Sequence, residues 1–106
     1  IIAGIDDTGP HMFNVDLYGT LTEEMIISTG SGSPVAYGIL ESEYREDMDV
    51  EEAAKLAFKA VAAAIQRDIG SGDSIDVAYI KAGERYRELT YEEKKPLYAQ
   101  FVKTVY

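Results

Sequence analysis

The spacing of apolar residues changes from strand-like to helix-like at Ser33, and that change limits the fold more than any other feature. Up to Thr29 the apolar residues form short runs or alternate with polar ones, as over residues 11–17, which is typical of β-strands. After Ser33 they recur every three or four residues over two long segments, which is typical of helices. Another strand-like run follows at residues 74–80. This order predicts an α+β fold in which helices pack on one face of an antiparallel sheet.

The first connections between strands are short and rich in turn-forming residues. Residues 6–10 and 18–20 are too few for a crossover, so the strands that they join should be antiparallel. The expected strands are residues 1–5, 11–17, 24–29 and 74–80, with a short return strand at 85–89.

Two helices are expected, at residues 34–44 and 50–69. Ser33 as N-cap with Pro34 in the first turn would start the first helix. Asp49, with a glutamate three residues later, forms a variant of the capping box for the second, and Gly70 would cap its end. The tail after Thr90 should be a polar and aromatic helix or an extended arm, interrupted by its proline.

Composition limits the class of protein. The chain has 106 residues, enough for one modest domain, and 46% of them are hydrophobic. Its formal net charge of −9 repels phosphate backbones, which argues against nucleic acid as a partner. Without cysteine it has neither a disulfide framework nor a thiol site, and no apolar run approaches the roughly 20 residues that span a bilayer. The apolar β-branched start without methionine is expected of a piece of a longer chain or assembly.

An acidic residue ends the predicted buried stripe of the second helix. Residues spaced by four and three share this stripe: Val50, Ala54, Ala57, Val61, Ala64 and Asp68. At about 100° per residue, Asp68 points away from Lys59 on the polar side. Because burying an unpaired charge is costly, Asp68 should have hydrogen-bond or cationic partners. It either caps a turn or pairs with Arg67, or it belongs to a functional site.

The loop Thr29–Pro34, with sequence TGSGSP, does not fit the common phosphate-binding motifs. A dinucleotide fingerprint would need glycine where Val35 stands, and a P-loop lysine is absent, since the first lysine is Lys55. Two interpretations are left: a plain tight turn, or a strand-to-helix elbow whose small residues allow another group to approach closely.

Four stretches of the chain resemble the carboxyl-terminal half of a 20S proteasome β subunit of the archaeal type. They read GIDDTGPHMFNVDLYGT, TGSGSPVAYGILESEYREDM, VEEAAKLAFKAVAAAIQRD and SGDSIDVAYI. The resemblance implies an N-terminal nucleophile hydrolase fold, a four-layer αββα sandwich. Residues 1–106 would be the carboxyl-terminal part of one such domain, half of the sandwich, with a variable tail at 92–106.

The resemblance also implies a site. The family's nucleophile is an amino-terminal threonine whose own amine acts as base, helped by a lysine, a second aspartate and a glycine amide. None of these is expected in this chain, in which Ile1 stands first. Ser31, Asp68 and Ser71 match the family's residues around the threonine amine. Asp6 matches a position near a groove shared with a neighbouring subunit, and is a weaker candidate for substrate contact.

The implied function is threonine-type hydrolysis of peptide bonds in unfolded polypeptides, inside a chamber of stacked rings. The partners would be other β subunits and rings of α subunits, in the cytoplasm, with no cofactor, nucleic acid or membrane. The alternatives are a non-catalytic subunit or fragment that supplies only ring contacts, and a small stand-alone binding domain. His11, which has no ligand at metal spacing, is expected to be structural.

Overall fold

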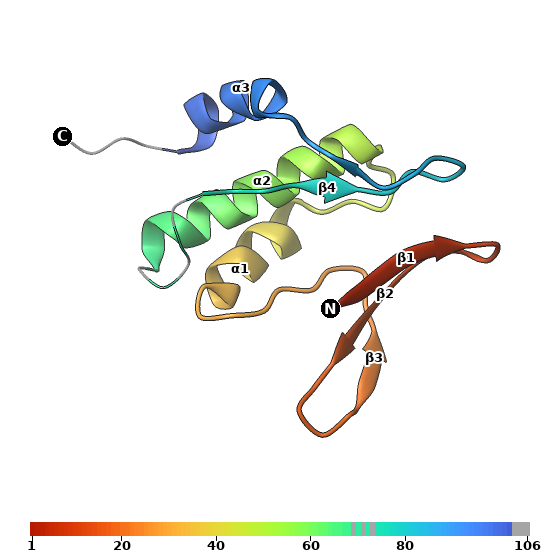
Figure 1. Cartoon of the computed structure of the whole chain (residues 1–106). Helices are drawn as coiled ribbons and strands as arrows, with labels where there is room; N and C mark the ends of the chain where they lie inside the picture. Colours follow the sequence, from red (N-terminus) through yellow and green to blue (C-terminus); the bar gives the residue numbers. More distant parts are fainter. Residues whose placement is uncertain (69, 71, 73, 103–106) are drawn as a thin grey trace.

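The computed structural model describes residues 1–68, 70, 72 and 74–102. Within these residues, three strands come first, two helices follow, and two short strands precede a last helix (Figure 1). The elements are β1 (Ile2–Asp6), β2 (Gly9–Val15), β3 (Leu21–Glu23), α1 (Ser33–Glu43), α2 (Val50–Arg67), β4 (Ala78–Tyr79), β5 (Arg87–Glu88) and α3 (Tyr91–Phe101). Every strand pair is antiparallel in the described part, which confirms the predicted α+β class.

The first sheet has the strand order β1-β2-β3 and differs from the prediction at its third strand. The turn at residues 16–20 is closed by a hydrogen bond from the Asp16 amide to the Thr20 carbonyl at 3.1 Å. Because the chain reverses so tightly, residues 21–23 pair with β2, with Glu23 opposite Phe13. The predicted strand at 24–29 is therefore wrong, and that segment leads from the sheet to α1.

The second sheet is shorter than the sequence predicts. Of the expected strand at 74–80, only Ala78 and Tyr79 pair, opposite Glu88 and Arg87 of the return strand. The residues before them run beside α2, where Ile75 and Val77 are buried in the core. Packing on the helix holds this segment, together with hydrogen bonds such as the one from the Leu89 amide to the Val77 carbonyl at 2.8 Å.

Helices α1 and α2 lie where they were expected, but three of their predicted end residues are wrong. Gly32, not Ser33, is the N-cap of α1, without a side-chain cap. Asp49 Oδ1 does accept the Glu52 amide at 2.8 Å, as the capping prediction requires, although the Glu52 carboxylate turns to Arg45. At the other end α2 stops at Arg67, two residues before its predicted end. Its C-cap is Asp68 rather than Gly70, because the chain becomes extended there.

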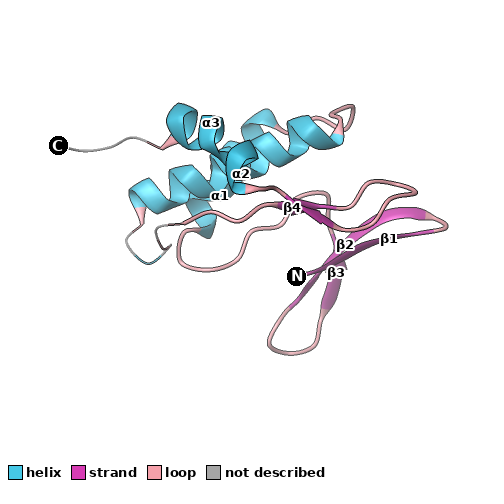
Figure 2. Cartoon of the chain, turned by 45° about the horizontal axis from the view of Figure 1, so that its top comes forward, coloured by secondary structure: helices cyan, strands magenta, loops and turns pink. Residues whose placement is uncertain are grey.

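The helices form one layer, and the β1-β2-β3 sheet lies to one side of it (Figure 2). Helix α1 packs along α2, and an ion pair joins them, with Lys59 Nζ 2.6 Å from Glu43 Oε2. Among the described residues, no Cα of the first sheet's strands lies within 8 Å of a Cα in any helix. The prediction that helices pack on a sheet therefore holds, in the described part of the chain, for the small second sheet, whose strand β4 lies against α2.

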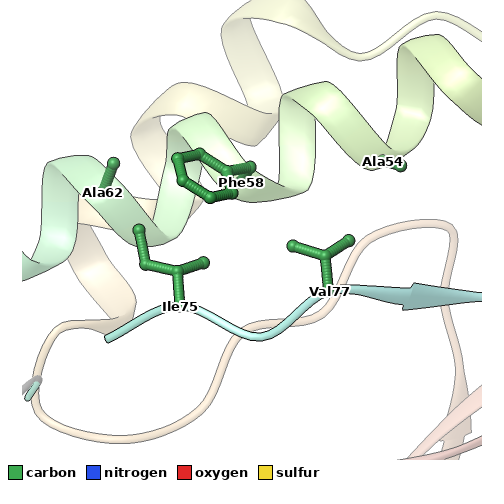
Figure 3. Close-up of a cluster of buried hydrophobic side chains, with 5 residues drawn as sticks. All are labelled: Ala54, Phe58, Ala62, Ile75 and Val77. Atoms are coloured by element: carbon green, nitrogen blue, oxygen red, sulfur yellow. The ribbon is translucent and has the colours of Figure 1, made fainter. Parts of the chain in front are cut away.

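Helix α2 is buried on two opposite sides, and the predicted single stripe is wrong in part. One side carries Phe58, which is 0% exposed and packs with Ala54 and Ala62 against Ile75 and Val77 (Figure 3). The other side carries the remaining buried residues of the helix: Leu56, Ala60 and Ala64. Of the predicted stripe, Ala57 and Val61 are exposed, because the neighbouring elements cover the helix on the other sides.

Helix α3 covers the outer side of this core and continues through Pro96, so the predicted interruption is not observed. Its start is fixed by a capping box between Thr90 and Glu93. The Tyr98 ring meets Phe58 edge-on at 5.0 Å, and its hydroxyl accepts the Ile75 amide at 2.9 Å. These contacts hold the helix on α2 despite the amide that proline lacks. Residues 103–106 of the predicted tail lie outside the described residues.

Candidate functional site

The Ser31 hydroxyl donates a hydrogen bond of 2.6 Å to Asp68 Oδ2, across 37 positions of sequence. Ser31 lies in the loop before α1, and Asp68 is the C-cap of α2. The carboxylate is half-buried and the serine is exposed. The prediction that Asp68 has a hydrogen-bond partner, and that Ser31 lies beside it, is confirmed.

The local sequence explains how these two residues meet. Gly30 adopts φ +96°, a conformation that glycine favours, and its carbonyl accepts the Ser33 amide at 3.1 Å. The chain therefore turns sharply at Ser31 and enters α1 at once. Because α1 and α2 are neighbours joined by a short connection, the start of the first lies near the end of the second. At Gly30 the loop is a tight turn, since nothing lies within 4 Å of the place where a Cβ would be, and this turn brings the Ser31 hydroxyl to Asp68.

A second glycine borders the pair. A Cβ added at Gly70 would lie 2.8 Å from Ser31 Oγ and 3.5 Å from Asp68 Oδ2. A side chain at residue 70 would therefore collide with the Ser31 hydroxyl, whereas its distance from the carboxylate would be an ordinary contact.

The other two candidate residues, Ser71 and Asp6, are not seen beside the Ser31–Asp68 pair among the described residues. Ser71 lies outside the described residues. Asp6 ends β1 in the separate sheet, where its carboxylate accepts the Thr8 hydroxyl at 2.6 Å. That hydrogen bond, together with one from the Thr8 amide, lowers the pKa of Asp6. Asp6 is therefore an exposed, ionised carboxylate on an ordered turn.

The Ser31–Asp68 pair is chemically suited to bind an ammonium or amine group. A carboxylate has several acceptor positions, so the hydrogen bond from Ser31 does not by itself prevent Asp68 from accepting another from an ammonium or amine group. Such charge-assisted bonds are stronger than neutral ones. In the part of the chain that the structure describes, no group of three His, Cys, Asp or Glu side chains is placed to hold a metal ion. No described helix is long and apolar enough to cross a membrane.

Comparisons with known proteins now identify the class. A family model described as proteasome subunit matches residues 1–80. A proteasome subunit beta 2 of Nitrosopumilus maritimus (strain SCM1) is 53% identical over 95 residues, which are 90% of this chain and 45% of the relative. A proteasome subunit beta 2 of Staphylothermus marinus (strain ATCC 43588 / DSM 3639 / JCM 9404 / F1) is 46% identical over 102 residues, 96% of this chain and 46% of that protein.

The antiparallel strands, the helix pair and these matches define a protein with a proteasome-type fold. The chain belongs to the proteasome subunit family, and the relatives that it resembles are archaeal β subunits. It spans somewhat less than half the length of those relatives, so it corresponds to part of a subunit.

Sequence reasoning missed one cluster of polar side chains. His11, expected to be only structural, contacts both Thr8 and Glu23 through its two ring nitrogens. The spacing Asp6-x-Thr8 in a tight turn was a usable signal, because aspartate commonly accepts the amide two residues on. The contact with Glu23 had no such signal, since it depends on which residues β3 brings opposite β2.

Proposed function

We propose that this chain is the carboxyl-terminal part of a proteasome β subunit that hydrolyses peptide bonds with an amino-terminal threonine supplied by the rest of the subunit. One observation carries the proposal. In this member of the family, the Ser31 hydroxyl before α1 lies 2.6 Å from Asp68 Oδ2 at the end of α2. Asp68 would accept hydrogen bonds from the threonine amine, and Ser31 would hold the carboxylate in position. Ser71 would add a second hydroxyl to this network.

The roles follow from the needs of the chemistry. A threonine hydroxyl is a weak nucleophile until a nearby base takes its proton, and the free amine of the same residue can do so. A carboxylate that orders the amine raises the fraction of sites with the correct geometry. Asp68 and Ser31 are thus positioning residues in this proposal.

Replacing Asp68 by asparagine in the complete subunit tests the proposal. Asp68→Asn keeps the shape of the side chain and removes the charge that would order the amine. Losing a charge-assisted hydrogen bond costs about 1.5–3 kcal/mol, so turnover should fall at least tenfold. The rate of hydrolysis of a fluorogenic peptide per folded site, measured together with the melting temperature, gives the answer.

A matched carboxylate serves as the control. Asp76 is an exposed aspartate that pairs with Lys94 at 3.2 Å, away from the Ser31–Asp68 pair, and Asp76→Asn should leave the rate unchanged. If Asp68→Asn lowers the melting temperature while the rate per folded site stays at the wild-type value, Asp68 is a structural residue and the proposal fails.

The alternative of a non-catalytic subunit has its own test. We expect residues 1–106 alone to hydrolyse no peptide, since the chain supplies support groups and Ile1 has no side-chain hydroxyl. Hydrolysis of a peptide reporter by purified chain, absent from a mock preparation, would contradict this. In the complete subunit, an upstream processed threonine supports the catalytic role, and its absence supports ring contacts only.

The same proposal fixes the partners. Other β subunits and rings of α subunits would surround the chain, and unfolded polypeptides would be the substrates within the chamber. Asp6, exposed at the end of β1, would face a groove shared with a neighbouring subunit and contact substrate there. No cofactor takes part in the proposed reaction, and the assembly would act in the cytoplasm.

A further inference from the structure

Four polar side chains of the first sheet form a continuous chain of hydrogen bonds. Thr8 Oγ1 donates to Asp6 Oδ1 at 2.6 Å, and the same hydroxyl lies 2.6 Å from His11 Nε2. The other ring nitrogen, His11 Nδ1, lies 2.5 Å from Glu23 Oε1. The chain therefore runs from the β1–β2 turn, through a side chain of β2, to β3.

Counting protons assigns the charge of the histidine. A threonine hydroxyl has one proton. Because an ionised Asp6 can only accept, that proton belongs to the 2.6 Å contact with Asp6, and the contact with Nε2 is then a hydrogen bond when the ring donates. Nδ1 faces a carboxylate oxygen, which accepts when it is ionised, so this nitrogen donates too. With the Thr8 proton on Asp6 and Glu23 ionised, both contacts are hydrogen bonds only when both nitrogens of His11 carry protons, that is, when the ring is an imidazolium.

The surroundings stabilise this form. Two carboxylates, from Asp6 at the end of β1 and Glu23 on β3, lie within 3.5 Å of the ring nitrogens. Phe13, on the same strand, stacks on the ring at 6.2 Å. Glu24 is a further acidic residue that lines the cleft beside His11. The hydrogen bond to Glu23 raises the pKa of His11 above its ordinary value.

The position of the cluster gives it a mechanical consequence. Strands β1 and β3 both pair with β2 and lie on opposite sides of it. Strand β3 has three residues, all exposed, so little else holds it against the turn at residues 7–8. His11 bridges the two because one ring nitrogen serves each side.

We propose that His11 is a protonation-dependent clamp that ties the β1–β2 turn to strand β3, and that loss of its second ring proton weakens this link. A neutral ring has only one N–H, so it can donate to Thr8 or to Glu23 but not to both. If Nδ1–H still donates to Glu23, Nε2 can only accept, so the Thr8 hydroxyl must turn from Asp6 to the ring. The chain then loses one hydrogen bond, together with the attraction of the imidazolium to the two carboxylates. Because the Thr8 hydroxyl contacts both Asp6 and the His11 ring, the position of the Asp6 carboxylate depends on the protonation of His11.

Hydrogen exchange of backbone amides in the complete subunit tests the clamp. Exchange of peptides that cover residues 6–12 and 20–24 is followed by mass spectrometry from about pH 6 to about pH 9, the range in which a histidine of raised pKa titrates. After correction for the intrinsic pH dependence of exchange, protection of these peptides should fall in a single step as the pH rises through the titration of His11.

Four variants make the test specific. In the Glu23→Gln and His11→Gln variants, the amides of these two peptides should exchange fast at every pH, without a step. Neither variant can form the charged clamp. Glu24→Gln and Asp7→Asn remove neighbouring carboxylates that have no hydrogen bond to His11 in the described chain, and should keep the wild-type step. A step that persists in His11→Gln, or a wild type without one, overturns the proposal. The same step in peptides from α2 would also overturn it, since it would report unfolding of the whole domain.

Discussion

Gly30 sets the direction in which the chain enters α1. Its φ of +96° lies in the region that side chains with a Cβ rarely adopt, and nothing lies within 4 Å of the place where a Cβ would be. The requirement for glycine is therefore conformational rather than steric. Ser31 follows directly, so the backbone of one residue decides where the hydroxyl that meets Asp68 is placed.

Alanine at position 30 should destabilise the protein for this reason. We expect Gly30→Ala to lower the free energy of unfolding by about 1–2 kcal/mol, the cost of a left-handed conformation for an L-residue. Chemical denaturation followed by circular dichroism measures it.

Gly38 provides the matched control. It lies inside α1 with an ordinary φ and open space around it, so Gly38→Ala should raise stability by about 0.5–1 kcal/mol. Equal effects at the two positions would show that the conformation of Gly30 is unimportant.

At the scale of elements, α2 is the centre of the described structure. It contacts α1, α3 and β4, and its buried residues lie on opposite sides. Phe58 is its largest buried side chain and meets both Tyr98 and Phe101 of α3. A pattern that is apolar on several sides is expected of a helix with neighbours on several sides.

Truncating Phe58 should therefore cost far more than truncating an exposed residue of the same helix. Phe58→Ala should lower the free energy of unfolding by about 3–5 kcal/mol, through lost burial and the cavity left behind. Val61→Ala, at a side chain that is 38% exposed, should change it by less than about 1 kcal/mol. Thermal or urea unfolding compares the two. Similar losses would mean that the core is not centred on Phe58.

For the molecule as a whole, the two parts of the described chain differ in what holds them. The helices, β4 and α3 share a buried core, whereas no residue of β1, β2 or β3 is buried. Large apolar side chains are exposed there, including Ile2 and Leu21. A small sheet without a covered apolar face is only marginally stable by itself.

Hydrogen exchange on residues 1–106 should separate these two parts. We expect amides in the middle of α2 to be protected at least about a hundredfold more than those of β1 and β2, because local opening of the sheet exposes little apolar surface. Exchange measured by two-dimensional NMR assigns the rates to residues. Uniform protection would show instead that the sheet and the helix layer unfold together.

The sequence by itself determined the elements that depend on local interactions. The spacing of apolar residues and the capping residues are signals between positions that are close in the sequence. From them the bounds of α1, α2 and the β1–β2 hairpin could be predicted to within two or three residues. The family resemblance added the meeting of Ser31 with Asp68, which local pattern alone could not supply.

Only the tertiary structure decided which surfaces are covered and where the elements end. Helix α2 has apolar residues on several sides, and its neighbours select the sides of Phe58 and Leu56 while leaving Val61 exposed. Strand β3 begins where the turn at 16–20 sends it, so Glu23 reaches His11 and the segment after Glu24 leaves the sheet. These outcomes depend on contacts between residues far apart in the chain, and such contacts form only when the elements pack.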